Sequence, residues 1–326
     1  MRLLYFNPEN DLALAANDPH YTPPASALQM ATDLQRLPLR WAEPDDFVLL
    51  RDGSFIDAQG KVLHPTLSAL NYIPLPWGWS PLVVSDFLRA GIPASLLPSP
   101  SEMQAFRTLA GRATSAVVLR HLQEYLQAAG YGDSVIGEAH VCHDLHEARC
   151  WHKQWRDSIF KQPWSGSGRG ILPVHEGVLT AKNEAWIRRT LRQQGYVMAE
   201  PLYNRYYDFA LEFWRHADGH VTYEGLSLFM TTAGGVYAGN IVDTEEGKRR
   251  RLSSLIDLTL LDFVTTQLME ELSSLPPTFY VGPLGVDLLI TTEGLLHPCI
   301  EINFRMTMGW LALHIPPFFE EKSQFC

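Results

Sequence analysis

Two apolar segments near the carboxyl end of the chain, Gly285–Thr291 and Leu296–Ile302, are separated by the turn residues Glu293-Gly294. Apolar runs on either side of such a turn predict two antiparallel strands joined as a hairpin. The chain has 326 residues, of which 46% are hydrophobic and 19% charged, as in folded globular proteins. This length exceeds the usual size of one compact core, so we expect about two domains.

The predicted hairpin carries three polar side chains that could meet on one face. Residues two apart in a strand face the same side, so Glu301 and Asn303 project together, and Asp287 on the adjacent strand can meet them. Carboxylate and amide oxygens are hard ligands suited to a Mg²⁺ ion that carries nucleotide phosphates. The hairpin therefore predicts a metal site. The alternative is a solvent-exposed face with ordinary polar residues.

A second informative segment is a short apolar strand that ends in Lys161. A loop with three glycines, Ser165–Gly170, follows it after Gln162-Pro163-Trp164. Glycines let backbone N–H groups approach phosphate oxygens, and a nearby lysine supplies a point charge. The loop is not a Walker A sequence, because no Gly-Lys-Ser/Thr closes it. It predicts a phosphate-binding loop, with a flexible surface hairpin as the alternative.

Charge and composition exclude several classes of partner. The chain has 26 Lys and Arg against 36 Asp and Glu, a formal net charge of -10, which repels nucleic-acid phosphate and anionic lipid. We therefore expect no nucleic acid and no membrane as partner. No segment has the roughly 18–20 uninterrupted apolar residues of a membrane span, and four cysteines indicate a reducing compartment. We expect a cytoplasmic protein.

The two site segments together resemble the ATP-grasp superfamily of ATP-dependent carboxylate ligases. That family places a phosphate-binding lysine at the end of a strand before a Gly/Ser loop, and later an Asp followed by Glu-x-Asn. Lys161, the Ser165–Gly170 loop, Asp287 and Glu301-Ile302-Asn303 follow in this order. The resemblance covers about residues 101–309.

The resemblance implies an α/β fold of the α+β kind. A small N-terminal α/β domain would occupy residues 1–100, and a two-lobed ATP-grasp-like domain residues 101–326. The lobes would span about 101–198 and 199–326. Within the second lobe, the spacing of apolar residues predicts one long helix over Leu252–Leu272.

The resemblance also implies roles for individual residues. Asp287, Glu301 and Asn303 would hold Mg²⁺ (or Mn²⁺). An early-helix cation of the family is matched best by Arg112, and an Arg found before the metal Asp in some members is replaced by Gly285, so we assign its charge-neutralising role to Arg305. The implied ATP-binding residues are Arg112, Lys161, Ser165, Gly166, Ser167, Gly168, Glu200 and Leu202 at the adenine edge, and Asp208 at the ribose.

The implied function is an ATP- and Mg²⁺-dependent ligase that joins a carboxylic acid to an amine through an acyl-phosphate. Small-molecule carboxylates and amines would be its substrates, and a homodimer is left open. The alternatives are a module that senses ATP without turnover, and an ATP-dependent phosphotransferase. The polar residues Asn7, Asn10, Asp11, His20 and Tyr21 could line the cleft for the acceptor substrate, with turn and capping roles as the alternative.

Overall fold

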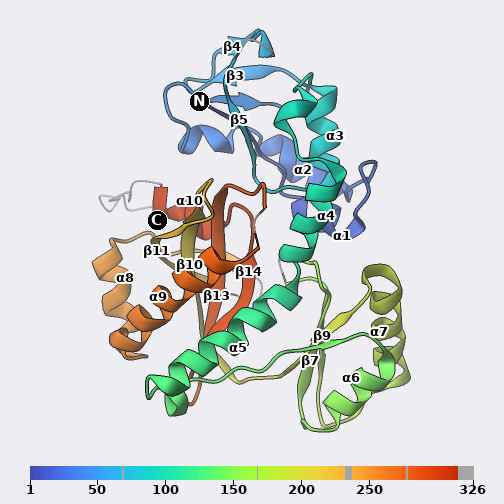
Figure 1. Ribbon diagram of the computed structural model, residues 1–326, viewed down its shortest axis with the longest axis vertical. Coiled ribbons are helices and arrows are strands. Elements are labelled where there is room, and N and C mark those ends of the chain that lie inside the picture. The colour runs from blue at the N-terminus through green and yellow to red at the C-terminus, as the bar shows by residue number, and fades with distance from the viewer. Residues whose placement is uncertain (68–69, 167, 232–236, 277, 315–326) are drawn as a thin grey trace, which may run out of the picture.

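The computed structural model describes residues 1–326 except 68–69, 167, 232–236, 277 and 315–326. Its described strands form three sheets, two of five strands and one of four. The mixed α/β fold, with a small N-terminal α/β unit followed by two further sheets, is confirmed (Figure 1). The domain limits at residue 100 and near residue 198 stay predictions.

The N-terminal sheet has the strand order β4-β3-β2-β1-β5. Its central strand β1 (Arg2–Tyr5) runs parallel to β2 and to β5. The carboxyl ends of parallel strands meet at one edge of a sheet, which is where α/β proteins place their ligands. The other elements of this unit are β2 (Phe47–Leu49), β3 (Phe55–Asp57), β4 (Val62–Leu63), β5 (Ile73–Pro76), α1 (Asn10–Ala16), α2 (Ala25–Asp33), α3 (Pro81–Arg89) and the 3₁₀ helices η1 (Leu37–Arg40) and η3 (Ala94–Leu96).

The small sheet has the antiparallel order β6-β9-β7-β8. Helices α6 and α7 lie beside it (Figure 1), and Trp151 and Ile187 from these helices pack with Phe160 of β7. Its elements are β6 (His140–Cys142), α6 (Leu145–His152), β7 (Ser158–Lys161), β8 (Ile171–Val174), α7 (Ala181–Gln194) and β9 (Val197–Pro201). Strand β7 is hydrogen-bonded to β9 on one side and to β8 on the other, so Lys161 lies at the end of an internal strand.

The large sheet is antiparallel with the order β12-β11-β10-β13-β14. The predicted hairpin is confirmed as β13 (Gly282–Thr291) and β14 (Leu296–Asn303). Helices α5 and α9 cover one face of this sheet (Figure 1), and α10 follows β14. The bounds are α4 (Pro100–Leu109), α5 (Arg112–Ala128), η4 (Gly132–Ser134), β10 (Arg205–Arg215), β11 (Val221–Thr231), β12 (Tyr237–Asn240), α8 (Glu245–Leu252), α9 (Leu258–Ser274) and α10 (Met308–His314).

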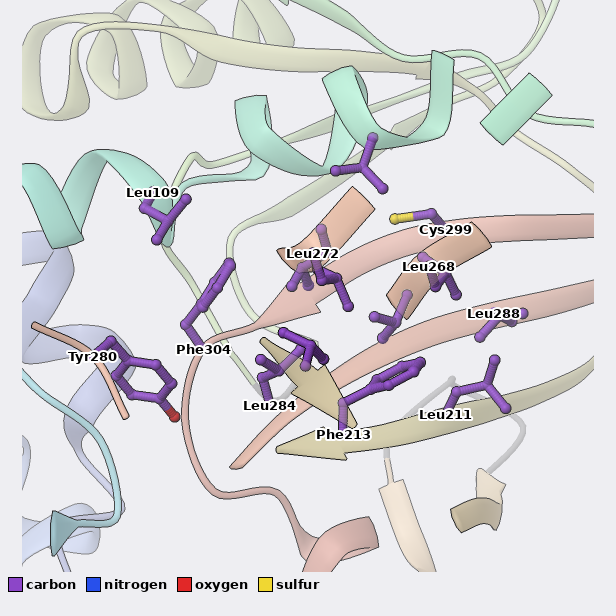
Figure 2. Packing of buried hydrophobic residues seen from close by; sticks show 14 of the residues in the cluster. Leu109, Leu211, Phe213, Leu268, Leu272, Tyr280, Leu284, Leu288, Cys299 and Phe304 are labelled. Atoms are coloured by element: carbon purple, nitrogen blue, oxygen red, sulfur yellow. The ribbon is translucent and has the colours of Figure 1, made fainter. Parts of the chain in front are cut away.

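One face of the large sheet is buried in the main core. Figure 2 shows Leu211, Phe213, Leu284 and Leu288 of the strands gathered near α9 residues such as Leu268, and all five are at most 1% exposed. Because side chains alternate along a strand, the residues between them, Glu212 and Asp287, project to the opposite face. The core therefore fixes which side of the sheet carries the polar groups.

One expectation about a helix was wrong. The single helix over Leu252–Leu272 is two helices, because α8 ends at Leu252 and Asp257 caps the start of α9 by accepting from the Thr259 N–H at 2.9 Å. A helix that the sequence analysis did not predict, α1, begins at Asn10 in the polar segment after β1. This second difference matters for the site, because it fixes the side chains of Asn10 and Asp11.

Candidate active site

The three predicted metal ligands lie together on the outer face of the β13–β14 hairpin. Asp287 is directly opposite Glu301 in the register, and Asn303 is opposite Gly285. The Asn303 Nδ2 group donates to Asp287 Oδ2 at 3.3 Å. Alternation along the strands therefore produces the juxtaposition that the sequence pattern predicts. The role of these residues as metal ligands stays a proposal.

Glu212 extends this polar face, and sequence reasoning missed it. Glu212 belongs to β10 and lies opposite Gly285 of β13, which in turn lies opposite Asn303 of β14. The three residues form one row across three strands. The Thr307 hydroxyl donates to Glu212 Oε2 at 2.8 Å. A side chain at residue 285 would begin 2.8 Å from the Glu212 carboxylate. Glycine at residue 285 therefore leaves room for the Glu212 carboxylate.

Two carboxyl groups of this face have raised pKa values. Burial, and next the charge of Glu301, raise the pKa of Asp287 to about 7. Burial raises the pKa of Glu212 to about 8. A bound cation would oppose the effect on Asp287 by favouring its charged form.

Arg112 joins this face to the glycine loop of the small sheet. Its guanidinium is buried and donates to Glu301 Oε2 at 2.7 Å and to the Ser165 hydroxyl oxygen at 2.7 Å. It also donates to the Gln162 carbonyl at 2.5 Å. The structure thus brings together a cation, the loop and a predicted metal ligand, three groups that are far apart in the sequence.

The predicted phosphate loop is the turn of the β7–β8 hairpin. The Gln162 N–H donates to the Gly170 carbonyl at 2.8 Å and closes the loop. Gly168 and Gly170 have φ values of +71° and +67°, a region that side chains rarely adopt, so glycine is required there. Ser167 lies outside the described residues.

Lys161 is paired with Glu200 across the small sheet. Its ammonium donates to Glu200 Oε2 at 2.5 Å, and both residues are buried. Of the other proposed nucleoside contacts, the Leu202 N–H donates to the Asp157 carbonyl at 3.1 Å. Asp208 forms an ion pair with Arg205 on its own strand. The structure brings Lys161 and Glu200 into contact. Asp208 pairs with Arg205, but it lies near enough to Asp287 for its charge to help raise the pKa of that residue.

Arg305, which follows β14, connects this strand to the N-terminal unit. Its Nε donates to Asp11 Oδ1 at 2.8 Å, and one of its NH₂ groups donates to Asn303 Oδ1 at 3.0 Å. A second link is the Met306 N–H, which donates to the Trp77 carbonyl at 2.8 Å. The carboxyl edge of the N-terminal sheet therefore closes one side of the site.

A small cavity of about 20 Å³ lies at this junction. Its lining comes from the start of α1, the end of α4, the segment around Ser165, and β14 with the residues after it: Asn10, Asp11, Leu14, Ala110, Pro163, Trp164, Ser165, Glu301, Ile302, Asn303, Phe304 and Arg305. Of the residues considered for the acceptor cleft, Asn10 and Asp11 line it. Asn7 instead bonds the backbone of Gly78, and His20 is exposed.

The donor chemistry of the β13–β14 face fits Mg²⁺. This ion commonly takes one or two protein carboxylates and fills its remaining positions with water and substrate phosphates. Asp287, Glu301 and the Asn303 carbonyl supply two carboxylates and one amide oxygen on one face. Within the part of the chain that the structure describes, no three His, Cys, Asp or Glu side chains are grouped to hold a metal by themselves. A metal here would therefore depend on phosphate oxygens as well.

The described helices include none with the length and apolar character needed to span a membrane. No known protein family matches the chain, and no curated protein matches it.

Several solved structures have a similar fold, at low identity. D-cycloserine synthetase DcsG is 12% identical with a TM-score of 0.49, and the match covers 96% of this chain and 97% of that chain. D-alanyl-alanine synthetase A from Vibrio cholerae O1 biovar eltor str. N16961 is 16% identical with a TM-score of 0.46, covering 94% and 88%. N5-carboxyaminoimidazole synthetase from Staphylococcus aureus complexed with ADP is 12% identical with a TM-score of 0.48, covering 96% and 76%. At TM-scores below 0.5 these likenesses carry no weight for function, which has to come from the site residues of this chain.

Proposed function

We propose that this chain is an ATP-grasp-type ligase, which uses ATP and Mg²⁺ to join a carboxylic acid to an amine. The observation that supports this most is the connection made by Arg112. It bonds both the loop proposed to hold phosphates, through Ser165, and Glu301 of the proposed metal set. Cationic side chains, the glycine backbone and hard oxygen ligands thus lie close together, and binding of a nucleoside triphosphate with its metal ion needs all three.

Each group has a task in this reaction. Asp287, Glu301 and Asn303 would hold Mg²⁺, which when bound would neutralise phosphate charge. Lys161 and Arg112 would bind phosphate oxygens. To do so, each would exchange its present ion pair, with Glu200 and Glu301 respectively, for a contact with phosphate. Transfer of a phosphoryl group relies mostly on positioning and charge neutralisation, so no activated nucleophile of the protein is needed.

The carboxylate substrate would attack the terminal phosphorus of ATP and displace ADP. Arg305 would bind the resulting acyl-phosphate, because its guanidinium lies beside Asn303 of the proposed metal set. An amine would then attack the acyl carbon and release inorganic phosphate.

The test is ADP release across a panel of amino acids and small carboxylates, with phosphate detected separately. A ligase releases ADP and phosphate together only when both an acid and an amine are present. ADP release without phosphate would instead support a phosphotransferase. ATP binding with no ADP from any pair of substrates would favour the sensing module.

Glu301→Gln separates these functions further. The change keeps the side-chain shape and removes one negative charge from the proposed metal set, so turnover should fall at least about a hundredfold, as for loss of an electrostatic catalytic group. Binding of ATP should survive in part. A matched control is Glu293→Gln, at the exposed turn of the same hairpin. Equal ADP production by wild type and Glu301→Gln would remove Glu301 from the metal site.

A further inference from the structure

The cavity between the N-terminal unit and β14 has the size of a single polar group. Its volume of about 20 Å³ exceeds the ~10–15 Å³ that a water molecule needs. It adjoins Glu301, Asn303 and Arg305, so whatever occupies it lies beside the groups that would handle the acyl-phosphate. An amino group is about as large as a water molecule. A whole substrate would extend from the cavity toward the cleft.

Asn10 and Asp11 line the N-terminal side of the cavity, and both side chains carry hydrogen-bond acceptors. Asn10 is 2% exposed, and its Oδ1 has no hydrogen-bond partner. The carboxylate of the next residue, Asp11, accepts from Arg305 through Oδ1. Buried polar atoms almost always have partners, because leaving one unpaired costs stability. An unpaired acceptor beside a carboxylate is suited to a donor with positive charge.

The surrounding backbone is shaped to admit these two side chains. A Cβ at Gly166 would lie 1.9 Å from Asp11 Oδ2, and a Cβ at Gly78 would lie 2.3 Å from the Asn10 amide. Gly78 is fixed in turn by Asn7, whose side chain donates to its carbonyl at 2.8 Å and accepts from its N–H at 3.2 Å. Two glycines therefore make room for one amide and one carboxylate, which is not expected of an accidental gap.

We propose that Asn10 and Asp11 bind the protonated amino group of the amine substrate; this assignment rests on the proposed ligase function. An ammonium group carries donors for both the Asn10 oxygen and the Asp11 carboxylate, and its charge matches the acid. Arg305 holds the other side of Asp11, so the amine and the acyl-phosphate would be bound next to each other. The amine substrate is thus a primary amine that is charged in solution.

The amine must lose a proton before it attacks. One proton passes from the ammonium nitrogen to the Asp11 carboxylate, which makes the nitrogen lone pair available. The nitrogen–carbon bond then forms, the bond between the acyl carbon and the phosphate oxygen breaks, and the phosphate leaves with that electron pair. The second proton of the nitrogen goes to the departing phosphate, which leaves a neutral amide.

The experiment compares two nucleophiles in the presence of ATP, Mg²⁺ and an acid from the panel. The first is the amine that supports turnover, and the second is hydroxylamine, which is mostly uncharged at neutral pH and traps acyl-phosphates as hydroxamates. Asp11→Asn should raise KM for the amine about ten- to hundredfold, as expected for loss of a charge-assisted contact. Hydroxamate formation should persist, because it needs no ammonium site.

Asn10→Leu provides a second variant that does not touch Arg305. It keeps the branched shape of the side chain, removes the unpaired acceptor, and should raise KM for the amine while KM for ATP stays unchanged. Asp18→Asn, an exposed acid in the same segment, is the matched control and should behave as wild type.

Three outcomes would overturn the assignment. An unchanged KM for the amine in both variants would mean that the cavity holds water only. A loss of hydroxamate formation equal to the loss of amide formation would make Asp11 a positioning residue for Arg305. Absence of both ADP and hydroxamate in the wild type with every acid would overturn the proposed function, and the amine site with it.

Discussion

Lys161 and Glu200 are buried together with 2.5 Å between ammonium and carboxylate. Lys161→Ala should weaken the binding of ATP about ten- to hundredfold and the binding of adenosine much less, because only ATP carries the phosphate charge that the lysine would contact. It should also lower the free energy of unfolding by about 3–5 kcal/mol, since Glu200 is left buried without its partner. Calorimetric titration of both nucleotides and urea unfolding measure the two effects.

Two further variants separate charge from folding at this position. Lys161→Arg should restore ATP binding only in part, because a planar guanidinium does not replace a compact ammonium. Lys182→Ala, at an exposed position of α7, should change neither quantity. Equal losses for adenosine and ATP in Lys161→Ala would show that the substitution acts through the fold.

Glu212 predicts a pH dependence of stability. Burial raises its pKa from 4.5 to about 8, so the folded state binds this proton more tightly than the unfolded chain does. Its contribution to stability is therefore present below pH 4.5 and is lost as pH rises from 4.5 to about 8. The slope should reach at most about 1.4 kcal/mol per pH unit.

Glu212→Gln removes this titration and keeps an oxygen that accepts from Thr307. Urea unfolding across the same pH window should give a flatter profile for Glu212→Gln than for wild type. Glu224→Gln, on the adjacent strand and exposed, should keep the wild-type profile. Parallel profiles for wild type and Glu212→Gln would assign the slope to other groups.

The sequence was informative for residues whose meeting depends on strand periodicity. Asp287, Glu301 and Asn303 could be grouped because one hairpin and a period of two place them on one face. Asp11 and Arg305 are 294 residues apart, and no local pattern indicates that they form an ion pair. Glu212 was not predicted for a related reason. Only the strand order places β10 next to β13, and with it Glu212 opposite Gly285.

At the scale of elements, α5 holds β14, the strand of the proposed metal ligands Glu301 and Asn303, in place. The Ile302 N–H, between Glu301 and Asn303, donates to the Ser115 hydroxyl oxygen at 3.0 Å, and both residues are buried. Ser115→Ala should lower the free energy of unfolding by about 1–3 kcal/mol, because it leaves this N–H unpaired. It should also reduce the Mg²⁺-dependent part of ATP stabilisation, since the strand that carries both ligands loses its anchor.

Urea unfolding and thermal denaturation with and without MgATP measure these effects. Thr114→Ala changes the neighbouring residue of the same helix and should have a smaller effect on both. If Ser115→Ala lost stability but kept the full response to MgATP, α5 would support the fold without positioning the ligands.

Element boundaries show where local patterns are insufficient. Strand β5 (Ile73–Pro76) contains two prolines, which argue against a strand, yet it is an edge strand of its sheet and can lack those donors. The apolar spacing of Leu252–Leu272 continues through a break, because Leu252 and Leu260 both face the core from different helices. Capping by Asp257 is the local signal that could have placed this break.

For the whole molecule, ATP should raise the melting temperature to its full extent only when Mg²⁺ is present. A ligand that binds the folded state alone adds about 2.7 kcal/mol at a hundredfold excess over Kd. Asp287 and Glu301 lie opposite each other at the proposed nucleotide site, so their carboxylates would repel ATP that arrives without the metal. A thermal-denaturation series with ATP, MgATP and Mg²⁺ alone checks this. An unchanged melting temperature with MgATP would contradict the proposed function as a whole.

The ion pair between Asp11 and Arg305 has a consequence for biosynthesis. During translation the N-terminal unit can fold as soon as its sheet is complete, since domains generally fold in the order in which they are made. Asn10 and Asp11 belong to that unit, but Arg305 and Met306, which contact Asp11 and Trp77, are made only after β14. A ribosome that stalls before β14 would therefore hold a nascent chain with a folded first sheet and an unassembled candidate site. The proposed reaction would not begin on such a chain until synthesis had passed Arg305.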